Sequence, residues 1–446
     1  MPAALGTRWY NAVWRWHFYA GIFCMPFVLW LAITGTIYLW KPQIESWLER
    51  PYDRLAVTAP RSTADSQVRA ALAAVPGSSL HKFQLPQSAN SATRVIVSTA
   101  AGDVRVYVDP YSLRVLKVEQ EGARPMRVIS DLHGTLKAGN WGSYLVEIAA
   151  CWTVVMLLTG LYLWWPRNAR GLGGILYPRL RRGRRGFWRD IHAVAGIWVA
   201  VFALFLISTG LPWAKFWGSY FQEVRQVTNT VDGPQDWPTG SAQTAAMMGD
   251  HAGHAAMSMR HEAPGVSELD RVIATAYPLG MAAPVMISPP ARGDDPWTVA
   301  SDAANRPLRG QATVDGRSGA LLSRKEFAQR HWLDKVVGYG IAAHEGALFG
   351  MANQLLGTAT ALLLMTLSLS GFIMWWRRRP QGLLGAPVPA QRPRFGFVPA
   401  GAIAILAFWM PLFGATLLIM LMLERTVFQR LPKVRGWLGL KAHGAA

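Results

Sequence analysis

"WRDIHAVAGIWVA" (residues 188–200) joins an arginine-rich connection to a long apolar run, and His192 stands at the junction. The stretch "WHFYAGIF" (16–23) has the same layout around His17. The two stretches align without a gap at an offset of 175 residues (192 − 17), and the alignment extends to Gly21 with Gly196 and Thr34-Gly35 with Thr209-Gly210. A histidine at the mouth of an apolar segment therefore occurs twice in register, which predicts a repeated membrane-spanning element.

A second correspondence runs at an offset of 211 residues (344 − 133). It matches His133 in "DLHGTLKAG" with His344 in "AAHEGALFG", and it continues through Gly160 with Gly371 and Trp164-Trp165 with Trp375-Trp376. The chain is therefore predicted to contain two copies of a span–module–span unit. The second module is longer by 36 residues (211 − 175).

Composition sets the class of protein. Of the 446 residues, 51% are apolar and only 16% are charged, which is typical of neither an ordinary soluble enzyme nor a chain that is apolar throughout. Segments of about 20 apolar residues, long enough to cross a membrane, lie at 18–40, 143–165, 192–214 and 347–376, with a fifth at 400–423 that Pro411 interrupts. We expect a mainly α membrane protein, a bundle of four or five transmembrane spans with two small α+β modules.

The predicted modules share an internal plan. Each opens with a helical pattern of apolar residues (Val68, Ala71, Leu72 and Val75; Leu269, Val272 and Ile273) and ends in a strand–turn–strand unit at 104–118 and 310–323. The predicted division is 1–40 (N-terminus and span), 41–132 (first module), 133–165 (span), 166–190 (basic loop), 191–214 (span), 215–343 (second module), 344–376 (span), 377–399 (loop), 400–423 (span) and 424–446 (tail).

Basic residues in the short connections predict the orientation. The connection 166–190 holds eight Arg against one acid, and 377–397 holds five Arg and no acid, so both are expected in the cytoplasm. This places the N-terminus inside and both modules outside. The fifth span would then leave the tail outside, although the five basic residues after residue 423 argue against it. The first span carries no cleavage site and is expected to be a retained anchor in a bacterial inner membrane. The net charge of +19 follows from this topology, and no nucleic-acid motif accompanies it.

The four repeated histidines form two pairs according to their expected depth in the membrane. His17 and His192 open spans on the cytoplasmic side, whereas His133 and His344 precede spans that start on the other side. Ionisable groups in spans are costly and favour a functional interpretation. Two imidazoles at one depth on different helices are how b-type haem is commonly held. We therefore expect an inner haem between His17 and His192 and an outer haem between His133 and His344, neither attached covalently because no C-x-x-C-H motif is present.

Other residues near these histidines have two interpretations each. Gly21 and Gly35 share a helix face with His17 and could make room for a macrocycle, or could let helices pack closely. Arg15 and Arg189 could pair with haem propionates, or could be ordinary positive flanks. The tryptophan pairs are expected to form an aromatic belt rather than an electron relay.

Two further features concern metal and sulfur chemistry. The surplus in the second module includes "AAMMGDHAGHAAMSMRHEA" (245–263), whose Met and His side chains suit copper ions unless the insert is merely a flexible segment. The candidate copper ligands are Met247, Met248, His251, His254, Met257, Met259 and His261. The two cysteines, Cys24 and Cys151, are expected at different depths of the membrane and so not to pair.

The chain resembles a known family through these same motifs. "VYVDPYSLRVL" and "ATVDGRSGALL" are similar to PepSY domains, and the histidine-bearing spans resemble the PepSY-associated transmembrane family over nearly all of residues 8–380. Members of that family include inner-membrane reductases of ferric siderophores with two b-type haems. The resemblance implies that His17, His192, His133 and His344 are haem ligands and that the modules are periplasmic.

The expected function is electron transfer from the cytoplasmic side to a periplasmic metal complex, a ferric siderophore or Cu(II), held between the two modules. The chain carries no nicotinamide- or flavin-binding motif, so the electron donor would be a quinol or a separate cytoplasmic reductase. Two alternatives stay open. The modules could bind peptides or proteins with the bundle as a mere anchor, or the histidines could serve a metal or haem transporter.

Overall fold

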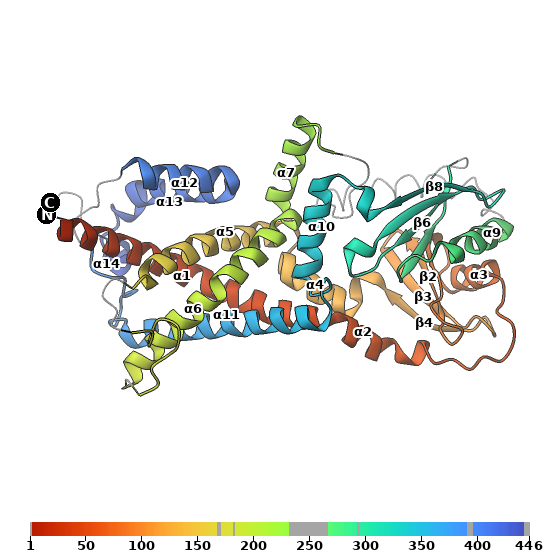
Figure 1. Ribbon diagram of the computed structural model, residues 1–446, viewed down its shortest axis with the longest axis horizontal. Helices are drawn as coiled ribbons and strands as arrows, with labels where there is room; N and C mark the ends of the chain where they lie inside the picture. The colour runs from red at the N-terminus through yellow and green to blue at the C-terminus, as the bar shows by residue number, and fades with distance from the viewer. Residues whose placement is uncertain are drawn as a thin grey trace. The chain divides into compact units, whose positions relative to one another are not determined.

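The computed structural model describes residues 2–166, 171–181, 183–231, 266–291, 295–389 and 396–440. The chain divides into two compact units (Figure 1). We call Met1–Thr36, Leu132–Glu223 and Leu355–Ala446 the transmembrane unit, and Ile37–Asp131 and Val224–Gln354 the sheet unit. Each is described by itself.

Long apolar helices build the transmembrane unit. They are α1 (Pro2–Leu39), α5 (Gly139–Trp164), α6 (Gly183–Gly210) and α11 (Met351–Arg378). At a rise of about 1.5 Å per residue, each exceeds the roughly 30 Å thickness of a hydrocarbon core. With Pro411–Phe428, five helical segments among the described residues are long and apolar enough to cross a membrane. The four long predicted apolar segments are confirmed as helices, and the protein is a multi-pass membrane protein.

The fifth predicted span has a different structure. Residues 400–423 lie in two helices of 13 residues, α12 (Phe397–Trp409) and α13 (Pro411–Leu423), which meet at the non-helical Met410 and run side by side (Figure 1). A Cβ on Gly414 of α13 would lie 2.9 Å from the Ala407 side chain of α12, so the two helices pack closely. The apolar stretch is therefore a helical hairpin, because Pro411 breaks the helix that hydropathy alone would continue.

The hairpin returns the tail to the end of the bundle where α1 begins. At its tip, the Trp409 carbonyl accepts a hydrogen bond from the Trp217 indole (2.8 Å), just beyond the C-terminal end of α6. At its other end, α14 (Pro432–Leu438) lies against the first half of α1, where the Tyr19 hydroxyl donates to the Leu438 carbonyl (2.6 Å). The prediction that the tail lies on the opposite side from the N-terminus is wrong.

The sheet unit contains one continuous sheet. Its eight antiparallel strands follow the order β4-β3-β2-β1-β5-β6-β7-β8. Their bounds are β1 (Ser79–Gln84), β2 (Thr93–Thr99), β3 (Gly102–Val108), β4 (Val115–Gln120), β5 (Val285–Ser288), β6 (Trp297–Ser301), β7 (Gly310–Val314) and β8 (Leu321–Glu326). Both predicted strand–turn–strand units are confirmed as β3–β4 and β7–β8.

The two predicted modules are joined into a single body. Strand β1 pairs with β5 through Phe83 opposite Ile287 and Gln84 opposite Met286. Helices α3 (Ala64–Ala74) and α9 (Val266–Ala276) contribute to one hydrophobic core shared by both halves of the sheet. In it, the predicted helical positions Val68, Ala71, Leu269 and Val272 are all buried. Because β1 and β5 are hydrogen-bonded neighbours, the two modules adjoin at this joint, and the substrate site expected between them stays a prediction.

Short helices complete both units. In the sheet unit they are α2 (Lys41–Glu49) and α10 (Trp332–His344). Helix α4 (Pro125–Thr135) begins in the sheet unit and ends in the transmembrane unit, where it carries His133. In the transmembrane unit, α7 (Lys215–Val227) begins where the buried Glu147 of α5 accepts the backbone N–H groups of Phe216 (3.0 Å) and Trp217 (3.1 Å). A carboxylate from a neighbouring helix thus satisfies donors that every helix N-terminus leaves open.

The joint at β1 and β5 predicts a stability effect. Phe83→Ala removes a side chain that is 2% exposed, and we expect a loss of about 3 to 5 kcal/mol in the free energy of unfolding because a cavity forms in the shared core. Thermal unfolding of the full chain in detergent, followed by circular dichroism, measures it. Leu321→Ala on β8 is the control, since Leu321 is 45% exposed; equal effects of the two changes would contradict the shared core.

Candidate functional site

Two of the four predicted ligand histidines lie next to each other inside the transmembrane unit. The imidazole rings of His17 on α1 and His192 on α6 have their centres 6.3 Å apart, with an angle of 81° between the ring planes. These two histidines are 175 residues apart in sequence, and the packing of the bundle brings their rings together. The structure brings together the pair predicted for the inner site.

Each of these rings is anchored through its Nδ1 atom. His17 Nδ1 lies 3.0 Å from the Met156 carbonyl oxygen and 3.2 Å from Thr159 Oγ1, both on α5. His192 Nδ1 lies 3.1 Å from the Leu367 carbonyl oxygen and 3.2 Å from Ser370 Oγ on α11. A carbonyl oxygen only accepts hydrogen bonds, so Nδ1 carries the proton in both rings. The other nitrogen, Nε2, is then left with a lone pair, the form in which imidazole ligates a metal.

His133 repeats the arrangement elsewhere in the same unit. Its imidazole hydrogen-bonds to the Leu31 backbone, and its Nδ1 lies 3.0 Å from Thr34 Oγ1, both on α1. His344 is the last residue of α10 in the sheet unit. The pairing of His133 with His344 therefore stays a prediction from the sequence.

The glycines have a role that the sequence interpretation missed. A Cβ on Gly160 would lie 3.1 Å from Cε1 of His17, and one on Gly371 would lie 3.3 Å from Cε1 of His192. Gly35 stands in the same relation to His133, at 3.2 Å. The sequence left open whether Gly35 clears space for a macrocycle beside His17 or lets helices pack closely; in the structure it accommodates the ring of a different histidine. These glycines allow the Cε1–Nδ1 edge of an imidazole to come close to the neighbouring helix.

Three hydroxyl residues, Thr34, Thr159 and Ser370, were not among the predicted site residues. The signal that could have found them is a hydroxyl residue followed by glycine within an apolar helix, which occurs at Thr34-Gly35, Thr159-Gly160, Thr209-Gly210 and Ser370-Gly371. Three of these four pairs contact a histidine within the transmembrane unit.

The donor set fits a haem iron held by two imidazoles. A ligating nitrogen lies about 2 Å from its metal and about 1 Å from its own ring centre, so two rings on opposite sides of one metal have centres about 6 Å apart. The separation of His17 and His192 is 6.3 Å. Both rings also carry the N–H bond to a carbonyl or hydroxyl that metal-ligating histidines almost always make.

Charged residues beside the inner pair have protein partners. Arg15 donates to the Pro387 and Gly439 carbonyls of the C-terminal region. Asp190, two residues before His192, is 1% exposed and accepts from both Arg179 (2.7 Å) and Arg189 (3.0 Å). Arg15 thus contacts the C-terminal region, Arg179 ties its connection to α6, and Arg189 pairs with its sequence neighbour Asp190.

The two tryptophans of each pair have different surroundings. Trp164 and Trp375 donate their indole N–H groups to the carbonyls of Ile175 (3.2 Å) and Leu384 (2.8 Å) in the connections that follow their helices. Their neighbours Trp165 and Trp376 are exposed on the surface of the bundle, as expected of an aromatic belt.

The cysteine prediction is corrected in part. Both thiols are free and buried. Cys24 Sγ lies 3.6 Å from the Ala149 carbonyl, two residues from Cys151 along α5, so the two cysteines do not lie at widely different depths. The Met/His-rich stretch 245–263, with its candidate copper ligands, lies outside the described residues.

Comparison with known proteins identifies the family. The family described as the PepSY-associated TM region matches residues 14–378. The chain belongs to this PepSY-associated transmembrane family. No curated protein matches it. The matched region includes all four repeated histidines and both halves of the sheet.

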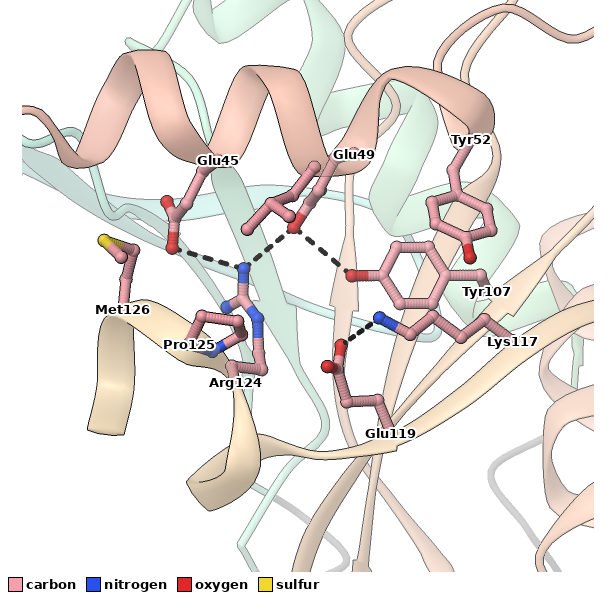
Figure 2. A pocket seen from close by; sticks show the side chains of 10 residues that line it. Glu45, Glu49, Tyr52, Tyr107, Lys117, Glu119, Arg124, Pro125 and Met126 are labelled. Atoms are coloured by element: carbon pink, nitrogen blue, oxygen red, sulfur yellow. Dashed lines mark hydrogen bonds and ion pairs between the residues drawn. The ribbon is translucent and has the colours of Figure 1, made fainter. Parts of the chain in front are cut away.

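This PepSY-associated protein also has a polar pocket in its sheet unit, with about 470 Å³ of empty volume (Figure 2). Glu45 and Glu49 reach down from α2 toward Arg124, which lies 3.4 Å and 2.8 Å from them. On β4, Lys117 pairs with Glu119 at 2.7 Å. Each charged side chain that lines the pocket has a partner within the protein, so we interpret the network as a joint between α2 and the sheet.

Glu49 is the centre of this network. It accepts hydrogen bonds from Arg94 (2.8 Å), Arg124 (2.8 Å) and the Tyr107 hydroxyl (3.2 Å). Burial alone would raise the pKa of Glu49, but the guanidinium groups of Arg94 and Arg124 outweigh it and hold the pKa below its ordinary value of 4.5. The charged form of Glu49 therefore stabilises the fold at neutral pH.

Removing this charge predicts a pH-dependent effect. We expect Glu49→Gln to cost about 1 to 3 kcal/mol of unfolding free energy at pH 7, because three hydrogen bonds lose a charged acceptor. A lowered pKa contributes stability above the ordinary value of 4.5 and loses it as the pH falls through the folded-state pKa. Unfolding of the two proteins at pH 7 and in acid should show the difference shrinking in acid; a constant difference would contradict the assignment.

Proposed function

We propose that this protein is a membrane oxidoreductase that binds one b-type haem between His17 and His192 and a second between His133 and His344. It would pass electrons across the membrane to a metal complex on the far side. The single observation that carries the proposal is the pair of imidazoles 6.3 Å apart, each with its Nδ1–H bonded to a helix carbonyl.

The residues contribute ligation, orientation and exclusion of water. His17 and His192 would supply Nε2 atoms from opposite sides, while Met156 and Leu367 fix the tautomer of each ring. When bound, a bis-imidazole haem supplies a one-electron carrier whose potential depends on its ligands and burial. Apolar helices around the pair keep water and competing ligands away.

The sequence repeat supports a second site at another depth. Under the proposal the chain is a tandem span–module–span repeat, so the first copy supplies His17 and His133 and the second copy supplies His192 and His344. The arginine-rich connections 166–190 and 377–397 would face the cytoplasm, and the sheet unit, as paired PepSY-like modules, would face the periplasm of a bacterial inner membrane.

The acceptor is proposed as a ferric siderophore or a Cu(II) complex. Reducing Fe(III) weakens its binding to hard oxygen donors, and reducing Cu(II) yields a soft ion that methionine prefers. The Met/His-rich stretch 245–263 supports the copper option, and family resemblance supports the iron option. The donor is proposed as a quinol or a separate cytoplasmic reductase.

A haem assay tests the proposal. Full-length protein produced with a haem supply should show a reducible b-type spectrum and two haems per chain. His17→Ala and His192→Ala should each lower the haem content by one per chain, because one axial ligand is lost. His331→Ala is the matched control, since His331 caps α10 by accepting the Leu333 N–H and lies outside both predicted pairs. A wild-type protein that is folded but shows no haem absorption would contradict the proposal and favour peptide binding.

A further inference from the structure

The three anchored histidines of the transmembrane unit share one local pattern on the helix that receives them. A carbonyl at position i, a hydroxyl residue at i+3 and a glycine at i+4 surround each ring. The three sets are Leu31, Thr34 and Gly35 for His133; Met156, Thr159 and Gly160 for His17; and Leu367, Ser370 and Gly371 for His192. We call each set an imidazole seat.

The hydroxyl in each seat acts toward the imidazole as an acceptor. Thr34 donates its own hydrogen to the Trp30 carbonyl (2.8 Å), Thr159 donates to the Val155 carbonyl (2.7 Å), and Ser370 donates to the Leu367 carbonyl (3.0 Å). A hydroxyl whose hydrogen is used in this way offers only lone pairs to Nδ1. The imidazole N–H is therefore shared between two acceptors, a carbonyl and a hydroxyl.

The glycine in each seat sets how close the ring comes. In all three seats the position that a Cβ would occupy lies 3.1–3.3 Å from Cε1, the carbon next to Nδ1. A methyl group there would push the ring away by a few tenths of an ångström and lengthen the Nδ1 bonds, which already measure 3.0–3.2 Å. Hydroxyl and glycine thus act together, since one supplies the acceptor and the other lets the ring reach it.

We propose that Thr159 and Ser370, with Thr34 at the third histidine, are positioning residues that hold each imidazole in the Nδ1–H tautomer and leave Nε2 as the ligating nitrogen. The consequence of this inference for haem ligation rests on the proposed function, whereas the tautomer itself does not require a bound haem. Donation from Nδ1–H makes the imidazole a more basic ligand, so losing an acceptor weakens ligation.

Nitrogen NMR tests the tautomer without haem. In full-length protein labelled with ¹⁵N-histidine and reconstituted in lipid, the signals that vanish in His17→Ala or His192→Ala should report a protonated Nδ1 and a bare Nε2. Thr159→Val should add a second population for His17, because one of two acceptors is gone. Thr159→Ser, which keeps the hydroxyl, should restore the wild-type spectrum. Thr360→Val is the matched control, a buried hydroxyl on α11 that donates to the Leu356 carbonyl.

Haem binding supplies the second measurement. We expect Thr159→Val and Ser370→Ala each to weaken haem affinity about tenfold to a hundredfold and to raise the reduction potential, while Thr159→Ser and Thr360→Val behave as wild type. Wild-type rings in the Nε2–H tautomer, or equal behaviour of Thr159→Val and Thr159→Ser, would overturn the inference. A chain that binds no haem but shows the Nδ1–H tautomer would overturn the proposed function and leave the tautomer assignment standing.

Discussion

The hydrogen bond from a histidine Nδ1–H to a helix carbonyl is the interaction on which the transmembrane unit depends. A polar N–H inside an apolar bundle is costly without a partner. A helix carbonyl already accepts its own backbone N–H, yet it keeps a second lone pair, and a nearby hydroxyl adds a further acceptor. The chain uses this solution for His17, His133 and His192. Each bond also ties two helices that are far apart in sequence, so packing and chemistry are fixed by the same contact.

The sheet unit shows what the two halves of the chain share and where they differ. Strand pairing places Val95 opposite Val106 in one half and Val299 opposite Ala312 in the other, and these core positions are all buried. On the neighbouring register positions, the first half carries Arg94, Tyr107 and Lys117, whereas the second carries Thr298, Thr313 and Ser323. Apolar positions that form the shared core are kept, while the charge network around Glu49 exists in one half. The paired strands of the two halves therefore share buried apolar positions and differ in the polar residues between them.

Hydropathy and helix periodicity predicted the long spans, the two module helices and both strand–turn–strand units, because these features depend on local sequence. The hairpin of α12 and α13 was not predicted, because hydropathy does not distinguish two short apolar helices from one long span. Its direction is decided by long-range bonds such as Trp217 to Trp409 and Tyr19 to Leu438. The depth of Cys24 was misjudged for a related reason. The helix that carries it begins well before the apolar run, so Cys24 lies in the interior of α1 rather than near its end. Constant offsets identified the histidines, but only side-chain contacts revealed Thr159 and Ser370.

One helix links the two depths of the proposed electron path. Helix α1 carries His17 and also the seat for His133 that begins at Leu31, 14 residues (31 − 17) further along. At about 1.5 Å per residue, these two levels are about 21 Å apart along the helix axis. That separation is too long for His17 and His133 to ligate one iron, because two rings on one metal have centres about 6 Å apart. His17 finds its partner in His192 at its own level. A second metal at the level of His133 would need an imidazole from another element, and the residue that the sequence offers for this is His344.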